Sequence, residues 1–419
     1  MKFIDLFSGI GGFRSGLEKN GHKAIAYSEV DKYAKQSYTS IYETSEELDL
    51  GDITKVSNEQ WQDLKGKANI IVGGSPCQSF SLAGKRRGFE DTRGTLFFHY
   101  VNAVKEVQPE FFIFENVKGM ISHDKGETIK TVLSSFNEIG YDIDFDVFNS
   151  KYYGVPQNRE RIYIVGKRKD LGINESRESV KGKKKLDQLK NWAIENINYV
   201  KLLPENNNEN VEKRLADVLE DEVDEKYYLS EEKTKKLTLN LDLEGLSPAL
   251  NCMRGGGLEP KIAVREATKQ GYAIAEQGDS VNVTYPDSKT RRGRVGKQVA
   301  QTLQAGEVNQ GVIINPLKDN TYKSWRYEQN VFDSNGITRS LKASLGGTPE
   351  IINKKYNQLR IRKLTPLECW RLQGFKDEQF YKAKDNGVSN SQLYKQAGNA
   401  VTVNVVDAIT KELIKHGLQ

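Results

Sequence analysis

One stretch near the start of the chain, Asp5-Leu6-Phe7-Ser8-Gly9-Ile10-Gly11-Gly12-Phe13, predicts a strand, a glycine-rich turn and the beginning of a helix. Glu29 follows a second apolar run about twenty residues later. This order is typical of α/β units in which the turn brings the backbone close to a nucleoside and the acid bonds the ribose hydroxyls. The glycines do not follow the GxGxxG spacing, so a plain strand-to-helix turn remains an alternative.

Short apolar runs continue to alternate with amphipathic segments through about the first 165 residues, the pattern of successive βα units. The fold class predicted is α/β, a doubly wound, Rossmann-like sheet. We expect strands at 3–7, 24–28, 69–72, 111–115, 143–148 and 161–165, and helices at 13–20, 32–41, 94–107 and 127–139.

Two acids indicate what the glycine-rich turn would bind. Asp5 lies in the strand before the turn, where a carboxylate would repel a pyrophosphate but suit an ammonium group. Gly51-Asp52-Ile53 places another acid at a strand end, where it can accept a hydrogen bond from an adenine amino group. A cationic adenosine without phosphates, such as S-adenosylmethionine, therefore fits these residues better than NAD.

A cysteine in a turn and a carboxylic acid at a strand end form the candidate catalytic pair. Cys77 lies in Gly73-Gly74-Ser75-Pro76-Cys77-Gln78-Ser79-Phe80, and Glu115 lies in Phe114-Glu115-Asn116-Val117. Because strand carboxyl ends face the ligand crevice of such a sheet, both groups could touch one bound ring. The thiol needs a positive neighbour to ionise, which Gln157-Asn158-Arg159-Glu160-Arg161 can supply. Taken alone, a cysteine is more often a small buried hydrophobic residue.

Size and composition set limits on the class of protein. The chain has 419 residues, enough for two domains, and its net charge of +5 permits a polyanionic partner without requiring one. We find no run of eighteen apolar residues and no signal-peptide pattern, and therefore expect no membrane association. The three cysteines and four histidines form no metal-ligand spacing, so we expect a reduced, metal-free, cytoplasmic protein.

The middle of the chain differs in character from both ends. From about 247 to 352 it is rich in glycine and threonine, and a loose motif recurs as Ala249-Leu250-Asn251, Thr302-Leu303-Gln304 and Ser340-Leu341-Lys342, each before glycines. This predicts a small β-rich domain, whose glycine tips either form ordinary turns or approach a ligand. Helical signals return at Thr365-Pro366-Leu367-Glu368. We therefore predict a first catalytic part at 1–170, an inserted domain at 171–360 and a return segment at 361–419.

Together these motifs resemble the cytosine-C5 DNA methyltransferases. The resemblance covers roughly 1–166 and 360–410, and the middle falls where the family keeps its variable target-recognition domain. Besides the motifs above, it includes Arg371-Leu372-Gln373-Gly374-Phe375 and Gln396-Ala397-Gly398-Asn399-Ala400-Val401. It implies a Rossmann-like S-adenosylmethionine-dependent domain interrupted by a smaller, β-rich target-recognition domain.

The resemblance also implies roles for individual residues. The Cys77 thiolate would add to C6 of a flipped-out cytosine, Glu115 would donate a proton to N3, Arg161 would hold O2, and Arg159 would support the surroundings of Cys77 or Glu115. On the cofactor side, Phe7 would contact the adenine, Glu29 the ribose and Asp52 the adenine amino group, while Asn399 would close the methionine end. The other expected cofactor residues are Ser8, Gly9, Gly11, Gly12 and Ile53. The product would be S-adenosylhomocysteine.

Two basic segments are candidates for contact with DNA. The stretch 78–95 alternates glycines with Arg86, Arg87 and Arg93, which predicts either a mobile lid or a static basic loop. Residues 288–297 carry five cations, including Arg291, Arg292 and Arg294, and no acid within these ten residues. A solvated loop is the alternative there, but arginines can contact phosphates or pair with guanine in the major groove.

The partner expected is therefore double-stranded DNA. We expect a monomer, associated with the nucleoid when bound to DNA, that modifies DNA in a restriction-modification or phage protection system, with a cognate restriction endonuclease as a possible independent partner. An RNA-modifying enzyme with the same catalytic residues is one alternative, which the large inserted domain disfavours. A catalytically silent DNA-binding protein and a nicotinamide dehydrogenase are two others, and both leave Cys77 and Glu115 unexplained.

Overall fold

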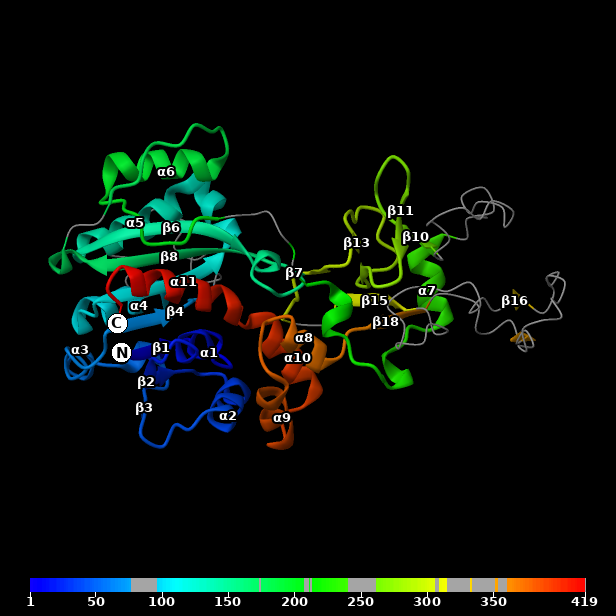
Figure 1. Cartoon of the computed structure of the whole chain (residues 1–419), viewed down its shortest axis with the longest axis horizontal. Helices are drawn as coiled ribbons and strands as arrows, with labels where there is room; N and C mark the ends of the chain where they lie inside the picture. Colours follow the sequence, from blue (N-terminus) through cyan, green and yellow to red (C-terminus); the bar gives the residue numbers. More distant parts are fainter. Residues whose placement is uncertain are drawn as a thin grey trace, which may run out of the picture. The chain divides into compact units, whose positions relative to one another are not determined.

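The computed structural model describes residues 1–76, 96–172, 175–206, 211, 213–239, 261–305, 309–314, 332–333, 351–352 and 360–418 (Figure 1). The chain forms two compact units. Unit 1 consists of Met1–Glu212 together with Cys369–Gln419, and unit 2 consists of Lys213–Glu368. Among the described residues, no helix is both long and apolar enough to cross a membrane.

Unit 1 is built on a seven-stranded sheet in the order β3-β2-β1-β4-β5-β8-β6. Neighbouring strands from β3 to β5 run parallel, whereas β8 is antiparallel to both β5 and β6. The strands are β1 (Lys2–Leu6), β2 (Lys23–Ser28), β3 (Leu48–Asp49), β4 (Ile70–Gly73), β5 (Phe111–Val117), β6 (Tyr141–Asn149) and β8 (Glu160–Arg168). All the expected strands are therefore confirmed, with ends that differ by a few residues, and the doubly wound α/β class is confirmed with them. The short β3 and the reversed direction of β8 were not expected.

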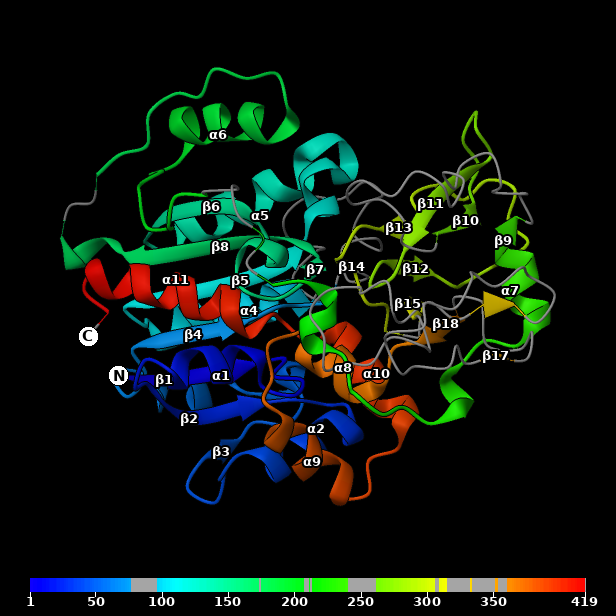
Figure 2. The same ribbon diagram turned by 45° about the vertical axis from the view of Figure 1, so that its right-hand side comes forward.

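Helices cover both faces of this sheet, which explains why its strands are continuous apolar runs. Successive side chains of β5 alternate between two cores: Phe112 and Phe114 pack with α4 and α5, whereas Phe111 and Ile113 pack with α1 and α11. Although they lie at opposite ends of the chain, α1 and α11 are side by side (Figure 2). The helices of unit 1 are α1 (Gly12–Glu18), α2 (Lys32–Ile41), α3 (Asn58–Gln62), α4 (Leu96–Val107), α5 (Glu127–Glu138), α6 (Lys185–Asn196), α9 (Asp377–Asp385), α10 (Asn390–Asn399) and α11 (Val403–Lys415).

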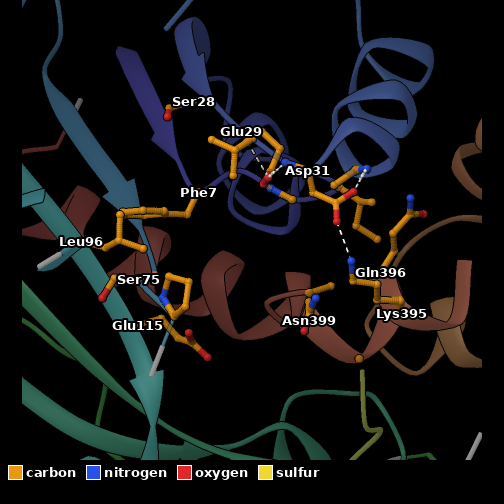
Figure 3. A pocket seen from close by; sticks show the side chains of 18 of the residues that line it. Phe7, Ser28, Glu29, Asp31, Ser75, Leu96, Glu115, Lys395, Gln396 and Asn399 are labelled. Carbon is orange, nitrogen blue, oxygen red and sulfur yellow. Dashed lines mark hydrogen bonds and ion pairs between the residues drawn. The ribbon is translucent and has the colours of Figure 1, made fainter. Parts of the chain in front are cut away.

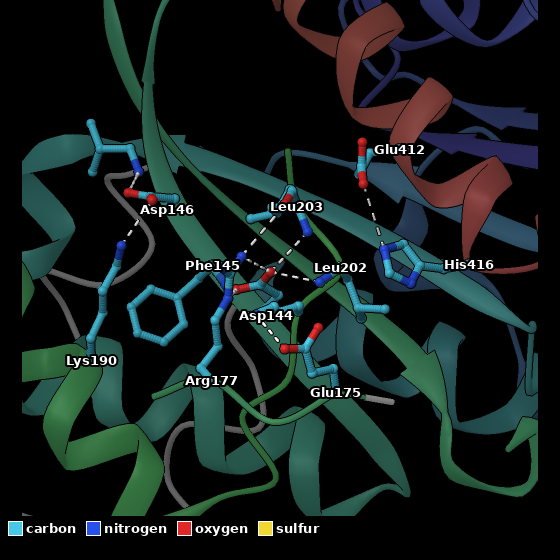
Figure 4. A network of polar contacts seen from close by, with 12 residues as sticks. Asp144, Phe145, Asp146, Glu175, Arg177, Lys190, Leu202, Leu203, Glu412 and His416 are labelled. Carbon is cyan, nitrogen blue, oxygen red and sulfur yellow. Dashed lines mark hydrogen bonds and ion pairs between the residues drawn. The ribbon is translucent and has the colours of Figure 1, made fainter. Parts of the chain in front are cut away.

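Within unit 1, the segment 175–206 packs on the sheet through a buried carboxylate on β6. Asp144 accepts hydrogen bonds from the backbone N–H groups of Leu202 and Leu203, both at 2.8 Å, and forms an ion pair of 2.6 Å with Arg177 (Figure 4). Burial raises the pKa of Asp144, and these donors oppose the shift. Since a buried carboxylate needs such partners, the segment is held to the sheet. The units divide at Glu212, whereas the sequence suggested a boundary near 170.

The described part of unit 2 is rich in short antiparallel strands. One sheet has the order β11-β10-β9 and another has the order β13-β12-β15-β18. Their small core contains Val264, Ala275, Val281, Ile313 and Ile361. The strands are β9 (Thr238–Leu239), β10 (Lys261–Arg265), β11 (Tyr272–Glu276), β12 (Ser280–Asn282), β13 (Val295–Gly296), β15 (Gln310–Ile314) and β18 (Arg360–Lys363), and the chain also forms α7 (Glu231–Leu237).

The remaining elements are short. They are β7 (Gln157–Asn158), β14 (Ala300–Gln301), β16 (Phe332–Asp333), β17 (Ile351–Ile352) and α8 (Pro366–Arg371). Of the three copies of the loose motif expected in the middle of the chain, the first and third lie outside the described residues. In the second copy, Thr302-Leu303-Gln304 is coil, and the apolar pair that follows it, Val312-Ile313, lies in β15.

Candidate active site

Unit 1 contains a cavity of about 940 Å³ at the carboxyl ends of its parallel strands. Its walls come from the segments that follow β1, β2, β4 and β5, and from α10 of the return segment. This is where ligands bind in open α/β sheets, because the strand order reverses here, between β1 and β4. Figure 3 shows ten of the lining residues with labels: Phe7, Ser28, Glu29, Asp31, Ser75, Leu96, Glu115, Lys395, Gln396 and Asn399.

Glu29 is fixed at the cavity wall by backbone donors. One carboxylate oxygen accepts the Gly9 N–H at 2.8 Å, and the other accepts the N–H groups of Val30 and Asp31 at 2.8 and 2.7 Å (Figure 3). Gly9 has a φ of +56°, a conformation that glycine adopts without strain. The turn after β1 and the acid after β2 are thus tied together, so the carboxylate is already oriented before any ligand binds.

The expected cofactor residues divide into two groups. Phe7, Gly9, Glu29, Asp52, Ile53 and Asn399 line the cavity, whereas Ser8, Gly11 and Gly12 do not. A Cβ on Gly11 would lie 2.4 Å from the Tyr42 ring, and one on Gly12 would lie 2.4 Å from the Val401 carbonyl oxygen. These two glycines are therefore required for close packing of the turn rather than for approach to a ligand.

Asp5 also differs from its expected role. Its side chain is fully buried and does not line the cavity, and its two carboxyl oxygens have no hydrogen-bond partner. Burial raises the pKa of Asp5 well above its ordinary value, while nearby Arg14 opposes the shift. The expectation that the Asp5 carboxylate suits a ligand ammonium group is therefore not supported.

Asp52 caps the short 3-10 helix Ile53–Lys55 at the cavity edge. Its carboxylate accepts hydrogen bonds from the backbone N–H of Thr54 at 3.0 Å and from the Thr54 hydroxyl at 2.8 Å. These bonds lower the pKa of Asp52, which therefore stays ionised. An ionised carboxylate retains free lone pairs and can accept a further hydrogen bond from a ligand amino group.

The return segment closes the cavity from the side of α10. Lys395 forms an ion pair of 2.6 Å with Asp31, which at the same time caps the N-terminus of α2 (Figure 3). Gln396 donates to the Tyr33 carbonyl and accepts from the Ser37 hydroxyl. Sequence reasoning missed these contacts. The position of Asp31 just before an amphipathic helix was a detectable capping signal. Its ion pair with Lys395, 364 residues away, could not be detected from the sequence.

Glu115 and Arg161 form the polar end of the cavity. They come from the paired strands β5 and β8, and Arg161 Nε lies 3.2 Å from a Glu115 carboxyl oxygen. Gly74 makes room for this acid, because a Cβ there would lie 2.9 Å from the other carboxyl oxygen. Burial raises the pKa of Glu115, although Arg161 and Arg159 oppose the shift. Glu115 thus remains protonated to a higher pH than an exposed glutamate and can serve as a proton donor.

Arg159 lines the cavity but uses its guanidinium to hold the return segment. The side chain is buried and donates to the carbonyl oxygens of Gly398 at 3.2 Å and Ala400 at 2.8 Å. Burial and the charge of Arg161 lower its pKa to about 10, so the group is still charged at neutral pH. Arg159 therefore positions the wall next to Asn399, a role that sequence reasoning did not identify.

Cys77 and the basic residues Arg86, Arg87 and Arg93 lie outside the described residues. The chain just before the cysteine is described, and Ser75 and Pro76 both line the cavity. Asn116 donates its side-chain amide to the Ser75 carbonyl at 3.0 Å, which ties this turn to β5 beside Glu115. Residue 77 therefore directly follows a segment of the cavity wall.

Comparison with known proteins identifies the family. Residues 1–415 match the family described as C-5 cytosine-specific DNA methylase. The chain belongs to this family. It is 40% identical to the orphan methyltransferase M.SPRI of Bacillus phage SPR, over 99% of this chain and 97% of that protein. It is 33% identical to the type II methyltransferase M.HpaII of Haemophilus parainfluenzae, over 99% of this chain and 89% of that protein. The protein is therefore an enzyme, a DNA cytosine-5 methyltransferase, of a family that uses S-adenosylmethionine.

Solved structures share the fold of this methyltransferase. The Dnmt2 methyltransferase of S. pombe superposes with a TM-score of 0.55 at 18% identity, covering 100% of this chain and 99% of that one. The DNMT2 of Spodoptera frugiperda, solved as a triple mutant, gives a TM-score of 0.54 at 18% identity, with 99% of each chain covered.

The candidate DNA-contacting arginines of unit 2 have different surroundings. Arg292 is exposed and Arg291 is half-buried. Arg294 is fully buried and donates to three backbone carbonyls, so its guanidinium is not presented to a partner. The prediction that Arg294 contacts DNA is therefore corrected. Within the described ranges we find no group of three or more histidine, cysteine or acidic side chains placed to hold a metal ion.

Proposed function

We propose that this methyltransferase transfers a methyl group from S-adenosylmethionine to C5 of a cytosine flipped out of a specific duplex DNA sequence, through a covalent bond between Cys77 and C6. The observation that carries the proposal is the Glu115–Arg161 pair at one end of a cavity whose other end presents Glu29 and Asp52. One end suits a pyrimidine ring, and the other suits an adenosine. Both ligands can therefore occupy a single cavity.

The donor set of the cavity fits S-adenosylmethionine. Glu29, Asp31 and Asp52 are acids along one side, which would repel a phosphate but can accept hydrogen bonds from ribose hydroxyls and an adenine amino group. Phe7 would pack against the adenine, and Asn399 would lie at the methionine end. When bound, the cofactor supplies an electrophilic methyl group on a sulfonium.

The residues of the chain would act on the cytosine in a defined order. The Cys77 thiolate forms a bond to C6, the C5–C6 double bond moves its electron pair toward C5, and Glu115 gives its proton to N3. Arg161 donates hydrogen bonds to O2, where negative charge develops. After methylation, C5 loses its proton to a base, the S–C6 bond breaks, and N3 returns its proton to Glu115. The thiolate and the acid are thereby regenerated.

Extrusion of the base and its selection need further parts of the chain. Flipping costs a few kcal/mol, which contacts with the DNA backbone can offset. We assign these contacts to the segment 78–95 with Arg86, Arg87 and Arg93, and to Arg291 and Arg292 of unit 2. The relatives named above are phage and type II methyltransferases, which supports a role in protecting DNA from a restriction endonuclease. The monomeric state and nucleoid association remain predictions.

A covalent trap tests the proposal. Purified enzyme and cofactor are incubated with DNA in which 5-fluorocytosine replaces cytosine, so that the adduct cannot lose a proton from C5. We expect a stable protein–DNA species whose peptide map locates the bond at Cys77. Cys77→Ser should form no such species and transfer no methyl group while still binding DNA and cofactor. A wild-type enzyme that methylates normal cytosine but never forms the species would contradict the covalent step.

A further inference from the structure

The loop between β12 and β13 in unit 2 presents an aromatic side chain in an unusual conformation. Tyr285 is 74% exposed, more than any other large hydrophobic side chain in the described part of the chain. Its φ is +47°, in the left-handed region that a bulky residue rarely adopts. Glycine or asparagine would adopt this conformation at lower cost. The backbone at Tyr285 must therefore be held in this conformation by other contacts of the loop.

Arg294 provides that support from beneath the loop. Its buried guanidinium donates to the carbonyl oxygens of Asn282 and Thr284, both at 3.0 Å, and to that of Tyr285 at 2.7 Å. The Tyr285 carbonyl also accepts the Ser288 N–H at 3.0 Å. A buried guanidinium bonded to three carbonyl oxygens of one loop fixes the loop backbone, because breaking these bonds would leave a buried charge without partners.

The loop that carries Tyr285 is rich in cations. Lys289 and Arg292 are exposed on the same loop, and Arg291 is half-buried there. Arg292 is braced by a hydrogen bond of 2.8 Å from its Nε to the Ala267 carbonyl, which leaves its terminal nitrogens available. Asp287 is the acid of this loop, and Lys236 lies 3.9 Å from it. A loop that carries both an exposed ring and exposed cations matches a nucleic acid, whose bases offer flat faces and whose backbone offers phosphates.

We infer that the loop 283–294 is a preformed DNA contact in which Tyr285 packs against a nucleotide, while Arg294 fixes the backbone that carries the ring and does not touch DNA. This inference rests on the proposed function. It adds a residue that would contact DNA through its aromatic ring, whereas the charged residues of the loop would contact phosphates. Because hydrogen bonds already hold the loop backbone, ordering it on DNA should cost little conformational entropy.

Replacement of Tyr285 separates binding from folding. Wild-type enzyme is first used to methylate DNA, and bisulfite sequencing identifies the site, which is then built into a fluorescein-labelled duplex. Tyr285→Gly removes the ring and relieves the left-handed strain, so we expect an unchanged or higher Tm and a Kd for the duplex raised about tenfold. Tyr285→Phe keeps the ring and should bind within about twofold of wild type. Tyr381→Ala, which removes an exposed ring of unit 1, is the matched control and should leave the Kd unchanged.

Each other outcome has a definite meaning. A Tyr285→Gly enzyme that binds the duplex as tightly as wild type, while wild type methylates it, overturns the inference and leaves the proposed function intact. A lower Tm for Tyr285→Gly would show that the ring supports the fold of unit 2 and would also overturn it. Failure of the wild type to methylate any cytosine would remove the proposed function, and the inference with it.

Discussion

Glu115 shows how one residue can be prepared for chemistry by burial. A carboxyl group in water is ionised at neutral pH and donates no proton. In the cavity its pKa is raised because burial disfavours the charged form, while Arg161 at 3.2 Å limits the shift. Burial therefore favours the protonated acid, and the contact with Arg161 orients it. Gly74 is part of this arrangement, since any side chain there would displace the carboxyl group.

The pH dependence of methyl transfer follows from the raised pKa of Glu115. In the proposed mechanism protonated Glu115 is the active form, so the rate of methyl transfer should fall as pH rises through this raised pKa. The same protonation contributes folding stability, which is also lost as pH rises through the pKa of the folded state. Glu115→Gln should lower the single-turnover rate by about a hundredfold or more and abolish this descending limb. Single-turnover rates measured across pH test both points. Glu127→Gln, which changes a glutamate on α5, is the control and should keep the wild-type profile.

At the scale of elements, the site depends on close approach between the first helix and the last segment of the chain. Gly12 at the start of α1 lies against the Val401 backbone, and Gly16 lies against Val406 of α11. Arg159, just before β8, holds the return segment by donating hydrogen bonds to the carbonyl oxygens of Gly398 and Ala400. These contacts place Asn399 and Lys395 at the cavity. The return segment can come this close to α1 because Gly12 and Gly16 carry no side chain.

A methyl group at Gly12 should separate these elements. A Cβ there would lie 2.4 Å from the Val401 carbonyl oxygen, a backbone atom that cannot rotate away. We expect Gly12→Ala to destabilise the enzyme by about 2 kcal/mol and to weaken cofactor binding. Chemical denaturation and calorimetric titration with S-adenosylhomocysteine measure the two effects. Gly119→Ala is the matched control, because a Cβ there would meet its nearest neighbour at 3.9 Å. Equal stability of the two variants would refute the packing role of Gly12.

At the scale of the whole molecule, the proposed catalytic and DNA-contacting parts lie in different compact units. Unit 1 carries the cavity, and unit 2 carries the loop with Tyr285 and the adjacent cations. Unit 2 has a small core, and much of its described part consists of short strands joined by turns. Such a scaffold suits recognition, because loops vary freely once a few strands hold their ends.

Salt dependence of DNA binding tests the role assigned to unit 2. Neutralising Arg291 and Arg292 together should weaken binding and reduce the slope of log K against log salt by about two, since each phosphate contact contributes about 0.9. Fluorescence anisotropy between low and moderate salt measures this slope. The double variant Lys411→Gln/Lys415→Gln on α11 removes the same charge from unit 1 and should leave the slope unchanged. Equal slopes for wild type and the arginine variant would exclude these residues from the interface.

The sequence alone located the strands and several of the residues that line the cavity. Apolar runs between glycine-rich turns specify buried parallel strands through local patterning, and functional side chains follow at strand ends. Phe7, Gly9, Glu29, Asp52 and Glu115 were therefore found from their positions along the chain, and the structure places all of them at one cavity.

The roles of Asp5, Arg159 and Arg294, and the attachment of 175–206 to the sheet of unit 1, were decided only by tertiary structure. Each depends on whether a polar side chain is buried and on which distant groups form hydrogen bonds with it. The buried carboxyl of Asp5 has no hydrogen-bond partner, whereas Arg159 donates to the carbonyls of residues 398 and 400 and Arg294 donates to three loop carbonyls. The Asp144 carboxylate accepts from the N–H groups of residues 202 and 203. Sequence patterns report local periodicity, whereas the cost of burying a charge depends on neighbours that folding alone brings together.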